Sequence, residues 1–129
     1  MNIERLADAA KEARTRAYAP YSGFRMGAAV LTSDDRVLTG TLVENVSLGL
    51  AMCAERAALF AAVDAGSRPV ALAVMSPRTD GTVTYPCGAC LQVALELGGP
   101  DTLVIAATTD GVIERSTVGE LLPRGPRKA

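Results

Sequence analysis

The sequence predicts an α/β fold, a three-layer α/β/α sandwich in which helices cover both faces of a mixed sheet of about five strands. Two short and almost wholly apolar runs, VALAVMS at 70–76 and TLVIAATT at 102–109, are typical of strands buried on both faces. A hairpin pattern precedes these runs, and segments with helical periodicity lie between them. Together these observations predict a sheet that is antiparallel at its start and parallel later.

The N-terminal half of the chain is expected to form a helix, a hairpin and a second helix. Apolar residues recur with a helical period over residues 2–18. The segments FRMGAAVLT at 24–32 and RVLTGTLVE at 36–44 are predicted to be two strands joined by a short Ser-Asp-Asp turn. An Ala-rich helix is expected over 53–65, and Gly66 ends it.

The C-terminal half begins with the first apolar run, and a helix from about 88–97 separates it from the second. An Asp-Gly turn and an edge strand near Val112 are expected to follow. A short helix is predicted around 118–122, and residues 122–129 are predicted to be a flexible tail. We find no linker or internal repeat, so 1–129 is predicted to be one domain.

The composition excludes several classes of partner. Hydrophobic residues make up 49% of the chain and charged residues 21%, as in globular domains. The net charge of −1 argues against nucleic acid or an anionic membrane surface as a partner. The N-terminus lacks an apolar signal core, and three cysteines cannot all pair within one chain. We therefore expect a cytoplasmic protein, in which thiols stay reduced and are free to bind metal.

The three cysteines lie at the predicted starts of two helices. Cys53 begins the Ala-rich helix, and Cys87 and Cys90 open the next helix in YPCGAC. If the two helices lie side by side on the sheet, all three sulfurs can face one ion. Helix N-termini favour thiolates, and three soft anionic ligands suit zinc. Three protein ligands leave a fourth position open, which is typical of a catalytic zinc site.

Other interpretations of these residues stay open on the pattern alone. The Cys87 and Cys90 pair can be a redox pair or half of a structural zinc site, and Cys53 can be an apolar core residue. Glu55 can be a first-turn acid that interacts with the helix dipole. A structural site needs a fourth ligand and no general base, however, so a carboxylate two residues from a candidate ligand favours catalysis.

The combination of Cys-x-Glu with a downstream Pro-Cys-x-x-Cys matches the pattern of zinc nucleobase deaminases. The chain resembles the cytidine deaminases, specifically the small, homotetrameric, three-cysteine type. The likeness runs in order through AYAPYSGFRMGAAVLT, VENVSLGLAMCAERAALFAAV, YPCGACLQV and GELLP. This resemblance implies that Cys53, Cys87 and Cys90 hold one Zn²⁺ per subunit. It also implies that Glu55 carries protons from the attacking water to the ring nitrogen and the leaving amino group.

Further contacts are expected beside this centre. We expect the Arg56 guanidinium to hydrogen-bond to ligand sulfurs and to withdraw charge from them, although a surface salt bridge is an alternative role. The resemblance implies substrate contacts from Phe24, Glu44, Asn45 and Ala54, with the ring of Phe24 against the pyrimidine. Phe24 can equally be a core residue at the start of a strand.

The sugar-binding segment departs from the family pattern. Family members usually have Asn-x-Glu-Asn here, whereas this chain has LVEN at 42–45. Leu42 therefore replaces an amide side chain with one that cannot form a hydrogen bond to the sugar, which costs about 1–3 kcal/mol of binding. Leu48 replaces a common tyrosine, Leu91 replaces an arginine, and the ending LLPRGPRKA lacks the family's phenylalanine.

These features predict zinc-dependent hydrolytic deamination of cytidine, 2′-deoxycytidine or a close analogue to the uridine product and ammonia. The alternative is deamination of a modified aminopyrimidine nucleoside such as blasticidin S, because blasticidin S deaminases share the metal motifs and a Glu-Leu-Leu-Pro ending. They lack, however, the Glu-Asn pair that is kept here. A zinc-stabilised binding module is the non-enzyme alternative. A nucleic-acid editor is disfavoured, because the chain has only two phenylalanines and three tyrosines for stacking.

Overall fold

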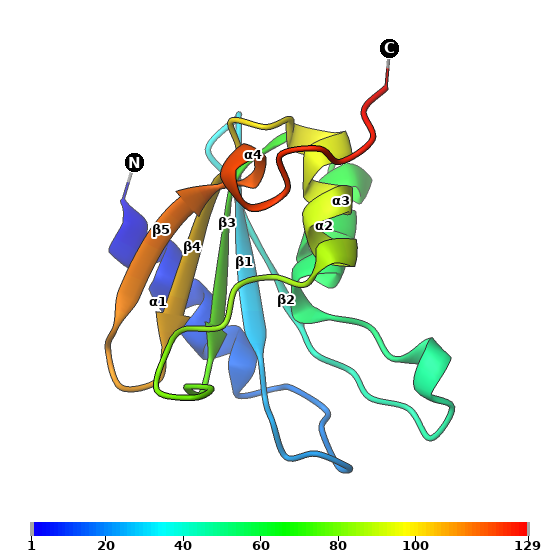
Figure 1. Cartoon of the computed structure of the whole chain (residues 1–129), viewed down its shortest axis with the longest axis vertical. Coiled ribbons are helices and arrows are strands. Elements are labelled where there is room, and N and C mark those ends of the chain that lie inside the picture. The colour runs from blue at the N-terminus through cyan, green and yellow to red at the C-terminus, as the bar shows by residue number, and fades with distance from the viewer. Residues whose placement is uncertain (1, 129) are drawn as a thin grey trace.

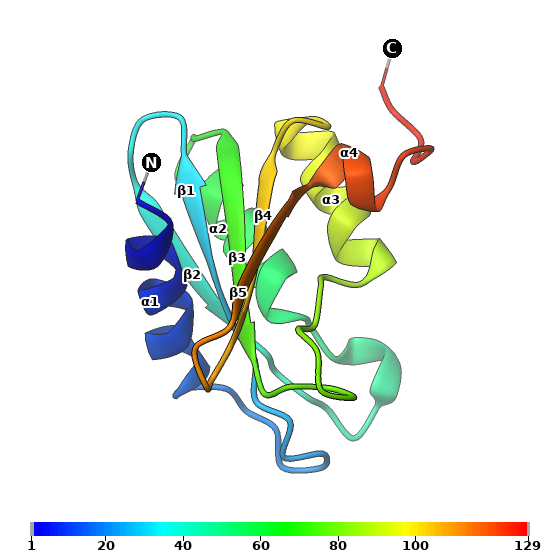
Figure 2. The same cartoon turned by 60° about the vertical axis from the view of Figure 1, so that its left-hand side comes forward.

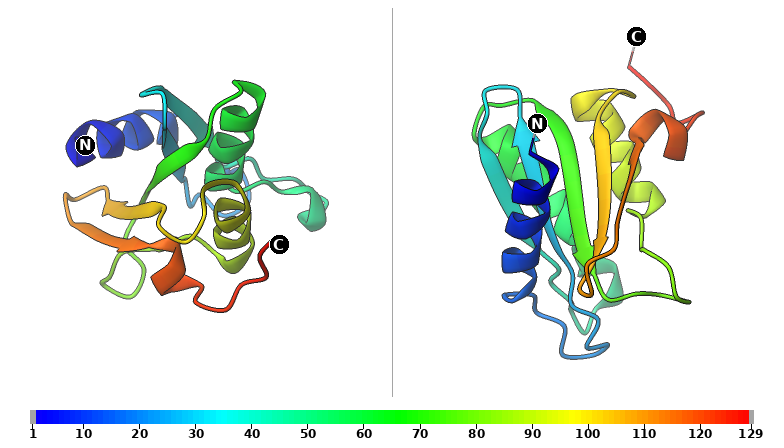
Figure 3. Two further views of the ribbon diagram at one scale, coloured as in Figure 1. Left: turned by 90° about the horizontal axis from the view of Figure 1, so that it is seen from above. Right: turned by 90° about the vertical axis from the view of Figure 1, so that its left-hand side faces the viewer.

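The computed structural model of the chain describes residues 2–128 and shows a five-stranded sheet in the order β2-β1-β3-β4-β5 (Figure 1). Helix α1 covers one face of the sheet and helices α2 and α3 cover the other, as the view from above in Figure 3 shows. The predicted three-layer α/β/α sandwich is therefore confirmed. The elements are α1 (Ile3–Arg14), β1 (Gly27–Thr32), β2 (Val37–Thr41), η1 (Leu48–Leu50), α2 (Ala54–Asp64), β3 (Pro69–Ser76), α3 (Gly88–Gly98), β4 (Leu103–Thr108), β5 (Ile113–Thr117) and α4 (Val118–Leu121).

The strand directions follow the predicted change from antiparallel to parallel, and an antiparallel pair closes the sheet. Strand β1 pairs antiparallel with β2 and β3, and β3 pairs parallel with β4. Strand β5 then pairs antiparallel with β4 and forms the expected edge strand. Because α3 connects the parallel strands β3 and β4, its N-terminus follows the carboxyl end of β3. Ligand sites in α/β proteins commonly lie beyond the carboxyl ends of such strands.

The prediction of a first helix over residues 2–18 was too long at its C-terminal end. Helix α1 begins after Asn2, whose side chain accepts a hydrogen bond from Arg5 N at 2.9 Å, and it ends at Arg14. Beyond it the chain leaves the helix, because Tyr18 pairs with the segment that follows β2. Tyr18 N donates to Leu42 O at 2.8 Å, and its carbonyl accepts from Glu44 N at 2.8 Å. Long-range pairing thus overrides the helical periodicity.

Two hairpin turns use the same side-chain chemistry. In the turn between β1 and β2, the Thr32 hydroxyl donates to Asp34 Oδ1 at 2.6 Å. In the turn between β4 and β5, the Thr108 hydroxyl donates to Asp110 Oδ1 at 2.5 Å. Each aspartate also accepts from an arginine, since Asp34 pairs with Arg36 and Asp110 pairs with Arg78. Short polar side chains that bond to one another and to nearby backbone groups favour such turns.

Glycine allows α2 to lie directly on the sheet. A Cβ atom at Gly40 in β2 would overlap with the carbonyl oxygen of Ala54 and lie 2.5 Å from Ala58 N. The facing helix positions Ala54, Ala58 and Ala62 are fully buried and have the smallest side chain with a Cβ. Small residues on both elements therefore fix the height of α2 above the sheet, and with it the position of the Cys53 segment.

The last segment of the chain lies against α3. Gln92 Nε2 donates to Pro126 O at 2.8 Å, and Gly125 lies close to Leu122 and Leu95. The described residues include no helix with the length and apolar character needed to cross a lipid bilayer.

Candidate metal centre

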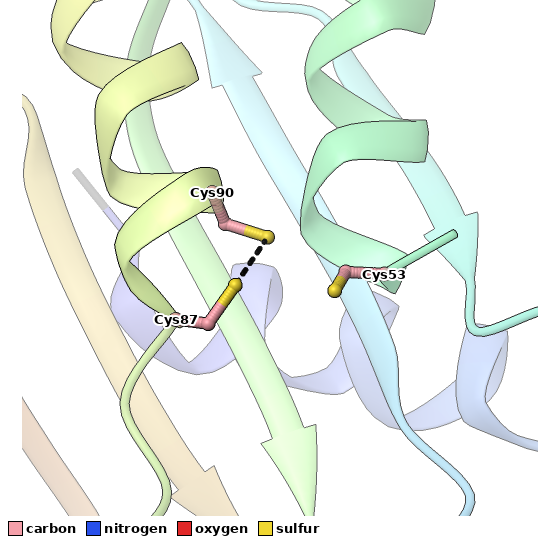
Figure 4. Close-up of side chains that lie close together, drawn as sticks. All are labelled: Cys53, Cys87 and Cys90. Atoms are coloured by element: carbon pink, nitrogen blue, oxygen red, sulfur yellow. Dashed lines mark hydrogen bonds between the residues drawn. The ribbon is translucent and has the colours of Figure 1, made fainter. Parts of the chain in front are cut away.

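The N-termini of α2 and α3 bring the three cysteine sulfurs together. Cys53 is the N-cap residue of α2, and Cys87 is the N-cap residue of α3, with extended backbone at both positions. Cys90 lies in the first turn of α3. Figure 4 shows the three side chains pointing toward one another, and their sulfur atoms all lie within 4.8 Å of one another. Helices α2 and α3 thus lie side by side, which is the condition that the sequence set for one shared site, and they bring sulfurs from separate segments close together.

The spacing of these sulfurs suits a zinc ion. Sulfur ligands about 2.3 Å from a tetrahedral zinc are about 3.8 Å apart from one another. The Cys87 and Cys90 sulfurs are 3.5 Å apart, and the remaining pairs fall within the 4.8 Å limit of the group. A zinc ion fits these three donors, which leave a fourth position for a further ligand.

The shifted pKa values of the clustered cysteine thiols also favour a bound cation. Burial raises the pKa of the Cys90 thiol, and the nearby Glu55 carboxyl and Cys53 sulfur raise it further. At Cys87 burial acts in the same direction, but hydrogen bonds from the Cys90 N–H, the Cys90 thiol and other nearby groups outweigh it and lower the pKa. Three thiols this close together cannot all ionise without a compensating positive charge.

Glu55 lies in the first turn of α2, and its side chain is almost completely removed from solvent. Its exposed fraction is 2%, and its Oε1 atom has no hydrogen-bond partner among residues 2–128. Burial raises the pKa of this carboxyl, and a hydrogen bond from the Glu55 backbone and then the charge of Arg56 offset that rise only in part. A buried carboxylate oxygen without a partner is costly unless a ligand or a water satisfies it. This position is therefore suited to a group that exchanges protons with a bound molecule.

The Arg56 guanidinium contacts one of the three cysteine sulfurs. Its Nη2 atom donates to Cys53 Sγ at 3.3 Å. This hydrogen bond raises the pKa of the guanidinium above its usual value, and burial opposes the rise. The described residues give Arg56 no carboxylate partner, so the surface salt bridge considered as an alternative is not formed.

The chain matches known proteins over most of its length. The family described as "Cytidine and deoxycytidylate deaminase zinc-binding region" matches residues 1–107. The chain belongs to the cytidine deaminase family. A cytidine deaminase of Halalkalibacterium halodurans is 46% identical over 123 residues, which cover 95% of this chain and 92% of that relative. A cytidine deaminase of Mycobacterium tuberculosis is 45% identical over 115 residues, or 88% of this chain and 81% of that relative. The crystal structure of a cytidine deaminase from Burkholderia pseudomallei superposes with a TM-score of 0.91 at 45% identity, covering 98% of this chain and all of that one.

In this member of the cytidine deaminase family, Glu44 and Asn45 lie on the segment between β2 and α2. This segment projects beyond the sheet and carries η1 (Figure 2). Val43 and Met52 exchange backbone hydrogen bonds of 3.0 and 2.9 Å. Glu44 follows Val43 in the sequence and Cys53 follows Met52, so this pairing fixes the backbone beside both residues. The segment borders an open hollow of about 290 Å³ lined by Tyr21, Ser22, Glu44, Asn45, Leu48 and Ala51.

The remaining predicted substrate residues lie around this segment. Leu42 is half-buried, and its N–H donates to Met26 O at 3.1 Å. Phe24 is also half-buried, just before β1, and Ala54 is fully buried at the start of α2. Asn45 is exposed, and its Oδ1 accepts from Ser47 N at 2.9 Å. The structure thus groups Ala54 with the metal centre, whereas Asn45 uses its side-chain oxygen within its own turn.

Two side chains with well-defined contacts near the site, those of Ser22 and Tyr85, received no role from sequence reasoning. The Ser22 hydroxyl donates to Glu44 Oε2 at 2.6 Å and accepts from Phe24 N at 3.0 Å. The Tyr85 hydroxyl donates to Glu114 Oε1 at 2.9 Å and ties the Cys87 loop to β5. A serine two residues before an N–H it can accept from is a local signal that could have identified Ser22. The Tyr85 contact spans separate elements and leaves no signal in the sequence.

Proposed function

We propose that this chain catalyses zinc-dependent hydrolytic deamination of cytidine and 2′-deoxycytidine, which yields uridine or 2′-deoxyuridine and ammonia. The main support is the combination of three convergent sulfurs with a buried carboxylate that lacks a partner among the described residues. Sequence relatives named cytidine deaminase add to this support. A structural zinc site gives no reason to bury an acid beside three ligands, so the arrangement favours a catalytic site.

Cys53, Cys87 and Cys90 would hold the zinc ion. When bound, zinc supplies Lewis acidity that makes a water molecule nucleophilic near neutral pH. Glu55 Oε1 accepts a proton from the water that attacks C4 of the pyrimidine and delivers it to N3 of the ring. The same carboxylate then transfers the second proton of that water to the 4-amino group, which leaves as ammonia. The reaction consumes one water, and Glu55 returns to its starting state.

Arg56 supports this chemistry by its contact with Cys53. Three thiolate ligands make the centre electron-rich, which weakens the Lewis acidity of a bound metal ion. A guanidinium that donates to a ligand sulfur draws charge from it. We infer that Arg56 tunes the Lewis acidity of the bound metal ion and is not needed for the three cysteines to bind it.

The sugar side of the site is expected to depend on Glu44. Leu42 offers no hydrogen-bonding group, so a ribose hydroxyl there loses a partner that the family usually provides. Glu44 keeps a carboxylate beside the hollow, and we assign it the remaining sugar contact. The ring of Phe24 is assigned to the pyrimidine, and Ala54 and Asn45 complete the proposed contacts. The apolar Leu42 also keeps a modified aminopyrimidine nucleoside, such as blasticidin S, as a second candidate substrate.

We further propose a homotetramer that works in the cytoplasm. Apolar side chains are exposed on the projecting segment, where Val46 is 80% and Leu48 is 84% exposed. Phe60 and Val63 are also exposed on α2, beside a groove shared with α3. Apolar patches of this kind are typical of subunit interfaces. Light scattering on the purified protein should give four times the chain mass of 13.4 kDa, and a monomer would contradict the assembly.

The test of the activity is a substrate panel followed by ultraviolet absorbance. Zinc-loaded protein is assayed with cytidine, 2′-deoxycytidine, cytosine and blasticidin S, while metal analysis reports the zinc content of the same sample. We expect one zinc per chain and the highest kcat/KM with cytidine or 2′-deoxycytidine. Preference for blasticidin S would select the second candidate. Zinc-loaded protein that deaminates none of these compounds would contradict the proposed function.

A further inference from the structure

We propose that Ser22 is a positioning residue, whose hydroxyl holds the Glu44 carboxylate in the orientation that receives a sugar hydroxyl of the substrate. The same hydroxyl fixes the loop that leads to Phe24. Ser22 thereby connects the residue assigned to the sugar with the residue assigned to the base. This inference rests on the proposed function, because it specifies how that site recognises its substrate.

Three donors from one loop converge on the Glu44 carboxylate. Its Oε1 atom accepts from Tyr21 N at 3.0 Å and from Ser22 N at 3.2 Å, and its Oε2 atom accepts from Ser22 Oγ at 2.6 Å. A carboxylate offers about four acceptor sites. Both sites on Oε1 are therefore filled, whereas no second donor among residues 2–128 reaches Oε2, which keeps one site for a ligand. We infer that a sugar hydroxyl donates to Oε2 at that free site.

The direction of the Ser22 hydrogen bonds is fixed by their partners. An ionised carboxylate can only accept, so the single hydroxyl proton of Ser22 points at Glu44. The lone pairs of the same oxygen are then available to the N–H of Phe24, which donates at 3.0 Å. The Ser22 hydroxyl is the first cause of the lowered pKa of Glu44 and so favours the charged form. The carboxylate therefore remains an acceptor for a sugar hydroxyl at neutral pH.

The backbone around Ser22 is held by contacts that do not involve its side chain. Gly23 N donates to Ala19 O at 2.9 Å, and Glu44 N donates to Tyr18 O at 2.8 Å. The Ser22 side chain is exposed, so its removal opens no cavity in the core. Ser22→Ala should therefore leave the fold intact while it removes the donor to Oε2, and the two backbone N–H groups still hold Oε1. A carboxylate held at one oxygen instead of two is less ordered before binding, which costs affinity.

The absence of an amide at position 42 increases the importance of this contact. With Leu42 unable to hydrogen-bond, Glu44 is the one polar group that we assign to the sugar hydroxyls. If the Glu44 carboxylate is misoriented, no second hydrogen bond to the sugar hydroxyls compensates for the loss. We therefore expect an effect of Ser22 on the substrate's sugar and not on its base.

The experiment compares Ser22→Ala and Ser22→Thr with wild type on two substrates. Cytidine has hydroxyls for Glu44, whereas 2′,3′-dideoxycytidine has none at the 2′ and 3′ positions. We expect Ser22→Ala to raise KM for cytidine by about 3- to 10-fold with little change in kcat, because a hydrogen bond to a charged group is lost. The kcat/KM for dideoxycytidine should not change, and Ser22→Thr, which keeps the hydroxyl, should restore cytidine binding. Ser33→Ala is the matched control, since Ser33 is exposed in the turn between β1 and β2.

A double-mutant cycle and a titration make the test decisive. In a Glu44→Gln background, Ser22→Ala should add little to the rise in KM for cytidine, because Ser22 acts only through the Glu44 carboxylate. Carbon NMR should show a higher Glu44 pKa in Ser22→Ala than in wild type. Equal losses on both substrates, a fall in kcat alone, or an unchanged Glu44 pKa would overturn the role of Ser22. A wild-type enzyme inactive on cytidine would instead overturn the proposed function and the sugar-binding role with it, while the titration would still report the contact between Ser22 and Glu44.

Discussion

The sequence allows two roles for Glu55, an acid that interacts with the helix dipole or a group that transfers protons, and only its surroundings in the structure distinguish them. A first-turn glutamate is common because it interacts favourably with the helix dipole, and such a residue is normally exposed. Glu4 fits that description in α1, where it is exposed. Glu55 holds the corresponding position in α2 but is 2% exposed. Burial of an acid is unfavourable for folding, so the dipole interaction alone does not account for Glu55.

Replacement of Glu55 with glutamine should separate these two roles. Loss of a general acid and base typically costs a factor of about 10²–10⁴ in turnover, and we expect a loss in that range. The three sulfurs are unchanged, so the zinc content should stay at the wild-type level. Glu4→Gln is the matched control and should leave turnover unchanged. Full turnover by Glu55→Gln, measured by loss of ultraviolet absorbance, would show that another group carries the protons.

Leu42 gives a second prediction at the residue scale. The N–H and C=O of Leu42 are both engaged, with Met26 and Tyr18, so a substitution changes the side chain and leaves the backbone in place. Leu42→Asn should lower KM for cytidine by about tenfold, because it adds a hydrogen bond to a sugar hydroxyl. Leu42→Ala serves as the control for the loss of the leucine side chain. If both variants change KM equally, the amide at position 42 does not reach the sugar.

At the scale of elements, the metal centre depends on the height of α2 above the sheet. The start of α2 supplies Cys53 as its N-cap residue and Glu55 in its first turn. Gly40 in β2 lies directly under this part of the helix. Packed interiors transmit small displacements instead of absorbing them. A change under the helix should therefore reach the cysteine sulfurs.

Gly40→Ala tests this dependence. The added methyl group would overlap with the helix backbone at Ala54, and overpacking of this kind typically costs about 1–3 kcal/mol of stability. We expect a lower unfolding temperature together with weaker zinc retention in the presence of a chelator. Gly49→Ala is the control, since nothing lies within 4 Å of a Cβ at Gly49. Equal stability of the two variants would contradict the close approach of β2 and α2.

The turn between β4 and β5 gives a prediction about pH. Hydrogen bonds from the Thr108 hydroxyl and then from Arg78 hold the pKa of Asp110 below its usual value of 3.8. A carboxyl with a lowered folded-state pKa stabilises the protein above its unfolded-state pKa, and this contribution is lost as the pH falls through the folded-state value. Asp110→Asn should therefore unfold at a lower temperature than wild type at pH 7, with a gap that narrows below pH 4. Asp101→Asn, at another exposed aspartate, is the control for the loss of one surface carboxylate.

At the scale of the whole molecule, the metal is expected to join the two helices of one layer. Cys53 belongs to α2, and Cys87 and Cys90 belong to α3, so a bound ion cross-links elements that are far apart in the sequence. A ligand that binds only the folded state raises stability by mass action.

Removal of zinc should therefore lower the unfolding temperature by at least about 5 °C, since a few kcal/mol produce shifts of this size in a domain of this length. The measurement is calorimetry of zinc-loaded protein with and without a strong chelator. Cys53→Ala removes one of the three ligands and should make the unfolding temperature much less sensitive to the chelator. An unfolding temperature that is the same for loaded and stripped wild type would show that the ion does not join α2 and α3.

The sequence by itself determined the α/β class, the order of the elements and four candidate residues of the metal centre, because short stretches of sequence carry these signals. The four residues are Cys53, Glu55, Cys87 and Cys90. Apolar runs reveal buried strands, and cysteines at helix starts reveal candidate ligands whatever the rest of the chain does. Tertiary structure alone decided where α1 ends, and that Ser22 and Tyr85 hold Glu44 and the Cys87 loop. Most of these features depend on residues that are distant in the chain and adjacent in space. Residues far apart in the sequence pair, bury one another and form hydrogen bonds only when the sheet and its two helical layers assemble.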